Sequence, residues 1–221
     1  MPHAEQPVER ALRMFAAAML GEIAHELNNR LATMRETLGL LEDLARAGRS
    51  GAAGTARAHV SLDEQVGRTL NLVQALGGLG GALGASQRAF DAGAAVAELL
   101  ALSERWARRL SLRLERQIAE NLPAATGDPA VFLCLVHRLL VRCAGGGDAA
   151  SGICVRVEKT GTGIAVRLVP MGARDRGPAA PGAEEEQTDR ELAARLGGEL
   201  TFEGDGAATV TLSPAGEADG R

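Results

Sequence analysis

The residues of this chain that could do chemistry together lie near its start, where residues 25–31 read HELNNRL. On a helix, His25 and Asn29 share one face because they are four residues apart. Their neighbours on that face, Gly21 and Ala32, are small, so we expect the imidazole to be uncovered rather than packed. Neutral imidazole is a good nucleophile near pH 7, so an uncovered histidine favours phosphoryl chemistry.

Two polar neighbours of His25 could assist such a reaction. Glu26 could accept the Nδ1 proton of the imidazole, which holds the tautomer that leaves Nε2 free to attack. Asn29 could orient a water molecule or a phosphoryl oxygen. The same residue types would also suit the solvated face of a plain coiled coil. The predicted catalytic residues are therefore His25, Glu26 and Asn29, and the elements around them decide between the two interpretations.

A long amphipathic helix must carry this segment. Between Pro7 and about Arg46, apolar residues recur at steps of three or four, and a second such stripe follows a turn at residues 47–54. Two antiparallel helices form half of a four-helix bundle, which homodimerisation would complete. The first stripe consists of Phe15, Met19, Ile23, Leu27, Leu31, Met34, Leu38, Leu41 and Leu44, and the second of Val60, Val66, Leu70, Val73 and Leu76.

The chain changes character after residues 77–84, GGLGGALG, which we predict to end the second helix as a flexible joint. We therefore divide the chain into a helical hairpin over residues 1–84 and a second, mixed α/β domain over residues 85–221. In the second domain we predict helices over Asp91–Trp106, Asp128–Ala144 and Asp189–Leu196, strands over 110–118, 153–157, 164–169, 199–203 and 207–212, and a loop over 173–188.

Composition excludes several classes of function. The 221 residues include 24 basic and 28 acidic side chains, so the formal net charge is −4, and there are only four phenylalanines, one tryptophan and no tyrosine. Such a chain lacks the basic footprint and the stacking rings of a nucleic-acid binder. No run of about eighteen apolar residues could span a membrane.

The chain start and the cysteines indicate the compartment. The first ten residues, MPHAEQPVER, contain no apolar core of a secretory signal. Cys134, Cys143 and Cys154 are odd in number and lie in apolar stretches without metal-binding spacing, so they are typical of reduced core thiols. We expect a cytoplasmic protein that binds neither nucleic acid nor a membrane.

HELNNRL resembles the phosphoacceptor box of two-component sensor histidine kinases, usually written HELNNPL. The order of a helical hairpin followed by an α/β domain is also similar to that family. The resemblance implies an α + α/β fold with a dimeric four-helix bundle, His25 as the phosphorylated residue, and a histidine-kinase-type ATPase α/β sandwich. Arg30 stands where the family usually has proline, so the helix bend that proline causes is not expected.

The helix that binds magnesium and nucleotide in this family usually reads GDxxxLxQVLxNLLxNA. Here Gly127 and Asp128 match its start, but Arg138 and Arg142 replace the two asparagines and Cys134 replaces the glutamine. A guanidinium cannot donate an oxygen ligand to Mg²⁺. At ~4 Å and an effective dielectric constant near ~20, two unit charges repel by about 4 kcal/mol, and a divalent ion roughly doubles that.

Two further nucleotide boxes of the family are also altered. Alignment of the DxGxG box places Pro170 at the aspartate that binds adenine, and Gly172 and Arg174 at the two glycines. The glycine-rich box that cradles phosphate is replaced by residues 181–186, PGAEEE, whose three carboxylates would repel a triphosphate. The segment before the last helix is also shorter than an ordinary ATP lid.

The resemblance and these departures together predict a degenerate member of the family. We expect a homodimeric histidine phosphotransferase of a phosphorelay, which passes a phosphoryl group through His25 between aspartates of response-regulator receiver domains without ATP. This chain is expected to bind no cofactor and no metal, and Mg²⁺ is expected in the receiver's acidic pocket.

Three alternatives remain open from the sequence. One is an active sensor histidine kinase with a divergent ATP site, in which Arg138 and Arg142 grip phosphate directly. A second is a non-catalytic pseudokinase scaffold that binds a receiver or a kinase. The third is a phosphatase of a response regulator, for which Glu26 and Asn29 are suitable.

Overall fold

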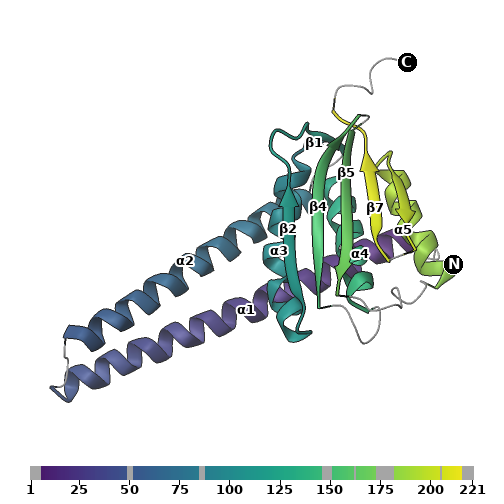
Figure 1. The fold of residues 1–221 in the computed structure, drawn as a ribbon. Helices are drawn as coiled ribbons and strands as arrows, with labels where there is room; N and C mark the ends of the chain where they lie inside the picture. The colour runs from purple at the N-terminus through teal and green to yellow at the C-terminus, as the bar shows by residue number, and fades with distance from the viewer. Residues whose placement is uncertain are drawn as a thin grey trace.

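A helical hairpin projects from an α/β domain in the computed structural model (Figure 1). Its helices are α1 (Pro7–Arg46) and α2 (Ala52–Leu83), which run antiparallel and contact each other. The start of α1 and the end of α2 lie beside the domain, whereas the end of α1 and the start of α2 lie far from it. The structure describes residues 6–48, 52–84, 88–145, 151–161, 163–172, 182–204 and 206–215.

The α/β domain is built on a five-stranded sheet of order β2-β4-β5-β7-β6. β2 runs parallel to β4, and every other pair of neighbours is antiparallel. The helices α3 and α4 lie behind the sheet in Figure 1. The elements are α3 (Ala92–Arg109), β2 (Arg113–Ile118), α4 (Pro129–Gly145), β4 (Gly152–Thr160), β5 (Gly163–Met171), α5 (Ala183–Arg195), β6 (Glu199–Phe202) and β7 (Ala208–Leu212).

Most predicted elements of this domain are present. The Asp91 side chain caps α3 by accepting a hydrogen bond of 2.9 Å from the Ala94 N–H, and α3 extends beyond its predicted end to Arg109. Asp128 caps α4 in the same way, through the Ala130 N–H at 2.8 Å. The predicted hairpin around residues 160–163 is confirmed by the antiparallel pairing of β4 with β5. A small sheet of β1 (Arg88–Phe90) and β3 (Ala125–Gly127) was not predicted.

The prediction of a flexible joint at residues 77–84 is wrong, because α2 continues as a helix to Leu83. Leu79 and Ala82 are buried, and α2 packs against α3 and α4 along this stretch. The three nearest atoms that a Cβ added at Gly78 would meet belong to the carboxylate end of the flexible Glu98 side chain of α3. Burial of apolar side chains thus outweighs the low helix propensity of glycine.

The predicted start of the last helix at Asp189 is also wrong. α5 begins at Ala183, so residues 183–188 are helical rather than a loop. Glu184, Glu185 and Glu186 lie in its first turn, where carboxylates interact favourably with the helix dipole. Residues 173–181 of the predicted loop, with Arg174 and Pro181, lie outside the described residues.

The apolar stripe of α1 divides between two partners. Near the start of α1, Phe15, Met19 and Ile23 are at most 3% exposed and belong to the same hydrophobic cluster as the α/β domain. Farther along, Leu31 and Leu38 are at least 50% exposed. One end of the hairpin is therefore fixed to the domain, and the other presents apolar side chains to solvent.

No helix in the described residues combines the length and apolar character needed to cross a bilayer. The three cysteines are buried and free, as predicted. Burial raises the pKa of Cys134 to about 12 and that of Cys143 to about 11, so both thiols are protonated at neutral pH.

Candidate functional site

His25 lies on α1 and is exposed, as its spacing predicts. Within the described residues, its imidazole has no hydrogen-bond or ion-pair partner. A Cβ added at Gly21, one turn before it, would meet no atom within 4 Å. An incoming protein can therefore approach this imidazole along an open helix face.

Glu26 lies beside His25 with its side chain only 17% exposed. Its Oε1 is 2.5 Å from Nη2 of Arg30, one turn along α1, and its Oε2 accepts a hydrogen bond of 3.0 Å from Nη1 of Arg105 on α3. Both oxygens of this carboxylate are thus held by guanidinium groups.

Asn29 contacts the same arginine. Its amide orientation is assigned from its hydrogen-bond partners, because the oxygen and nitrogen of an amide look alike. With Oδ1 facing Arg105, this oxygen accepts from Nη2 at 2.9 Å and from Nη1 at 2.5 Å. Arg105 therefore contacts both Glu26 and Asn29, the two polar residues predicted to assist His25.

Arg105 is the residue of this site that the sequence interpretation missed. In the sequence it is one of several closely spaced arginines, with Arg108 and Arg109, a pattern that is typical of a solvated basic face. Its side chain is instead only 21% exposed, and Arg109, one turn along α3, binds Glu22 of α1. The i, i+4 spacing of the two arginines matches that of Glu22 and Glu26, and this match is the signal that could have found them.

Arg30 occupies the position where the resembling family has proline. α1 is a single helix through this position. Besides Glu26, Arg30 contacts Gln65 of α2, with 3.5 Å from its Nη1 to Oε1. It thus connects the box to the second helix of the hairpin.

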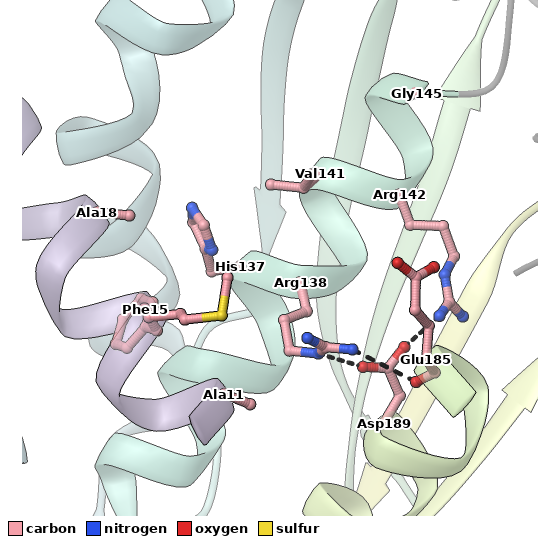
Figure 2. A pocket seen from close by; sticks show the side chains of 11 residues that line it. Ala11, Phe15, Ala18, His137, Arg138, Val141, Arg142, Gly145, Glu185 and Asp189 are labelled. Carbon is pink, nitrogen blue, oxygen red and sulfur yellow. Dashed lines mark hydrogen bonds and ion pairs between the residues drawn. The ribbon is translucent and has the colours of Figure 1, made fainter. Parts of the chain in front are cut away.

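Arg138 and Arg142, at the positions of the family's asparagines, bind a single buried carboxylate. Nε of Arg138 is 2.5 Å from Oδ1 of Asp189 on α5, and Nη2 of Arg142 binds Oδ2 of the same residue (Figure 2). The Asp189 side chain is 1% exposed. Burial raises the pKa of this carboxyl, and the two arginines oppose that rise.

These residues border a cavity of about 440 Å³ between α1, α4 and α5. Phe15 of α1 and His137 of α4 line it, with 5.3 Å between their ring centroids (Figure 2). Burial, and to a lesser extent Arg138, lowers the pKa of His137 to about 4, so this imidazole is neutral at physiological pH. The helix that carries His25 therefore forms one wall of the cavity.

The residues around Asp189 do not fit a magnesium–nucleotide complex. Each oxygen of the one buried carboxylate is taken by an arginine, and two guanidinium groups would repel a divalent cation. The first turn of α5 adds three glutamates where the family presents backbone N–H groups to phosphate. No cluster of three or more metal-ligating side chains occurs in the described part of the chain.

Comparisons with known proteins give matches only among solved structures. No protein-family model and no curated protein matches the sequence. The histidine kinase AdeS of Acinetobacter baumannii is 16% identical with a TM-score of 0.49, over 86% of this chain and 98% of that one. A bacterial phosphotransferase is 15% identical with a TM-score of 0.45, over 90% of this chain and 95% of that one. The catalytic domain of the histidine kinase ThkA is 13% identical with a TM-score of 0.47, over 59% of this chain and 97% of that one.

Proposed function

We propose that this protein is a cytoplasmic histidine phosphotransferase of a two-component phosphorelay. His25 receives a phosphoryl group from the aspartate of one receiver domain and passes it to the aspartate of another. The observation that carries the proposal is an exposed His25 in a phosphoacceptor-like box, combined with a changed magnesium-binding helix. Arg138 and Arg142, which replace the two asparagines of that helix, bind Asp189.

The transfer needs only groups that this chain and a receiver provide. Nε2 of His25 attacks the phosphorus of the aspartyl phosphate, a P–N bond forms, and the P–O bond to the receiver's carboxylate breaks. Mg²⁺ in the receiver's acidic pocket neutralises charge on the transferred group. The reverse step delivers the phosphoryl group to the next receiver, and Asn29 is placed one turn from His25 to contact a phosphoryl oxygen.

The same residues support the proposal that the protein does not use ATP. A triphosphate with its Mg²⁺ would have to displace the ion pairs of Arg138 and Arg142 with Asp189, which are largely buried. Breaking such a network leaves an uncompensated charge and costs several kcal/mol, in the range of about 3–5. We therefore propose that the α/β domain has kept the fold of an ATPase domain without its nucleotide.

A homodimer is part of the proposal. Leu31 and Leu38 of α1 and Val66, Leu70 and Val73 of α2 are each 45–56% exposed, which is unusual for a stripe of aliphatic side chains. Complete burial of a fully exposed side chain of this kind is worth about 1.5–3 kcal/mol, so covering the exposed half of each is worth about half as much. A second hairpin would cover this stripe and complete a four-helix bundle.

Reconstitution of the relay tests the proposal. A receiver domain phosphorylated with ³²P is mixed with the wild-type protein, and then an unphosphorylated second receiver is added. We expect label on His25 first and on the second receiver afterwards, with neither step in His25→Gln. Relay by His25→Gln would overturn the proposal, as would autophosphorylation of His25 by ATP and Mg²⁺ in the absence of receivers.

A further inference from the structure

Arg105 determines which chemical groups the box can offer to an incoming phosphoryl group. It reaches from α3 to α1 and donates hydrogen bonds to both Glu26 and Asn29. The Arg105 side chain is 21% exposed and that of Glu26 is 17% exposed, so this ion pair is largely shielded from solvent, whereas Asn29 is exposed. Among the described residues, Arg105 is the side chain of the α/β domain that hydrogen-bonds to the box.

The contact with Arg105 determines which group of the Asn29 carboxamide is free to bind another molecule. A carboxamide has one acceptor oxygen and one donor NH₂ group. Because Oδ1 of Asn29 accepts from two nitrogens of Arg105, the group left for an incoming molecule is the NH₂. An NH₂ group stabilises a phosphoryl oxygen, which carries negative charge. To orient a water molecule for attack on phosphorus, Asn29 would have to offer its oxygen instead.

The contact also occupies the nearest general base. Hydrolysis of an aspartyl phosphate requires a group that takes a proton from the attacking water. Glu26 is the carboxylate beside His25, but its Oε1 is held by Arg30 and its Oε2 by Arg105. Both residues that could activate water are thus engaged by arginines, and Arg105 is common to both.

We propose that Arg105 is a positioning residue. By holding Glu26 and Asn29, it allows phosphoryl transfer to His25 and suppresses hydrolysis of the receiver's aspartyl phosphate. This inference rests on the proposed function and specifies how the same site avoids acting as a phosphatase. In the suppressed reaction, a water oxygen attacks phosphorus, the P–O bond to the receiver's aspartate breaks, and the proton passes through Glu26 to solvent, which yields inorganic phosphate. Removal of Arg105 frees the Asn29 oxygen and one Glu26 oxygen for that reaction.

The lifetime of a receiver's acyl phosphate measures the suppressed reaction. In a His25→Gln background no transfer can occur, so loss of acyl phosphate reports hydrolysis alone. A receiver domain phosphorylated with acetyl phosphate serves as the probe. We expect Arg105→Met in this background to accelerate release of inorganic phosphate by about tenfold or more, and further substitution of Asn29→Ala to remove the acceleration.

Arg109→Met is the matched control, because Arg109 joins the same two helices through Glu22 but does not contact the box. We expect it to leave the acyl phosphate lifetime unchanged. If the two arginine variants accelerate hydrolysis equally, looser docking of the domain explains the effect and the inference is overturned. An unchanged lifetime in Arg105→Met overturns it as well.

A spectroscopic measurement tests the contact without any receiver. The side-chain NH₂ signals of Asn29 are assigned in a ¹H–¹⁵N spectrum of the full chain by their loss in Asn29→Ala. We expect these signals to shift in Arg105→Met and to stay in place in Arg109→Met. Signals that do not move in Arg105→Met contradict the contact. Failure to label His25 in the wild type would overturn the proposed function but would leave these two readouts valid.

Discussion

At the scale of single residues, Asp189 is the one charged residue that is buried in the described part of the α/β domain. Its carboxylate is 1% exposed and binds two arginines of α4, whose side chains are 27% and 12% exposed. Removal of one partner from a buried ion pair leaves the other charge desolvated without compensation. The network therefore stabilises the junction of α4 and α5 only as a complete set.

We expect Asp189→Asn to lower the free energy of unfolding by about 3 kcal/mol. Urea denaturation followed by circular dichroism measures this loss. Glu203→Gln is the control, because its pair with Arg167 is 33–40% exposed and such pairs contribute only about 0–1 kcal/mol. An equal effect of the two substitutions would contradict the importance assigned to burial.

The stability of the protein should depend on pH through His137. Burial lowers the pKa of His137 from 6.5 to about 4, so the unfolded chain binds a proton in this range that the folded protein does not. Stability is then lost as the pH falls from about 6.5 toward 4, by roughly 2 kcal/mol between pH 6.5 and 4.5.

Urea denaturation at several pH values checks this dependence. We expect His137→Leu to remove this component of the slope, whereas His59→Gln, at an exposed position on α2, should keep it. A slope that is the same in wild type and His137→Leu would show that other groups cause it.

The candidate box could be predicted from sequence because its residues are adjacent on one helix, where spacing determines the face. The exposure of His25 follows from that spacing. Arg105 could not be found in this way, since it contacts Glu26 across 79 positions of sequence. Only the docking of α3 against α1 distinguishes it from a solvated arginine such as Arg108, which is exposed.

At the scale of elements, the glycine-rich end of α2 shows how tertiary packing overrides local preference. Gly80 and Gly81 are exposed and helical, and a Cβ at either would meet no atom within 4 Å. Leu79 and Ala82, on either side of this pair, are buried and keep the segment helical. The glycines are therefore tolerated at a cost in stability rather than required for a joint.

Substitution of these glycines should stabilise the protein. We expect Gly80→Ala and Gly81→Ala each to raise the free energy of unfolding by about 0.5–1 kcal/mol, because alanine favours the helix. Gly48→Ala should have the opposite sign, since Gly48 has a φ of +61°, although it too has open space for a Cβ. Thermal unfolding measures all three. Destabilisation by Gly80→Ala would indicate that α2 needs a joint after all.

The elements of the α/β domain were largely predictable because alternation and caps are local signals. Strand β4, for example, buries Ile153, Val155 and Val157 at a spacing of two. The early start of α5 was missed because its first turn of glutamates has no apolar periodicity. Its helical state depends on contacts such as the hydrogen bond from Arg138 to the Glu185 carbonyl, which only the folded chain supplies.

At the scale of the whole molecule, the hairpin is anchored at one end and has uncovered apolar side chains at the other. The domain covers Phe15, Met19 and Ile23, while Leu31 and Leu38 are exposed. A second copy of the hairpin is the simplest partner with a matching stripe. Dimerisation would leave His25 accessible, because it lies on roughly the opposite side of α1 from Leu31 and Leu38.

A single substitution in the stripe should separate the dimer. We expect Leu38→Glu to convert the protein from a dimer to a monomer in sedimentation velocity experiments, because a buried carboxylate without a partner is strongly unfavourable. Leu40→Glu is the matched control: Leu40 is 57% exposed, against 50% for Leu38, but it faces the other side of α1. Dissociation by both variants, or by neither, would place the interface elsewhere.

The central claim is that His25 carries a phosphoryl group obtained from a receiver rather than from ATP. The most direct measurement is a single-turnover transfer in nucleotide-free buffer, in which a ³²P-labelled receiver domain is mixed with the wild-type protein and the acid-labile label on His25 is followed. We predict label on the wild type and none on His25→Gln. An unlabelled wild type that instead acquires phosphate from ATP and Mg²⁺ would contradict the claim.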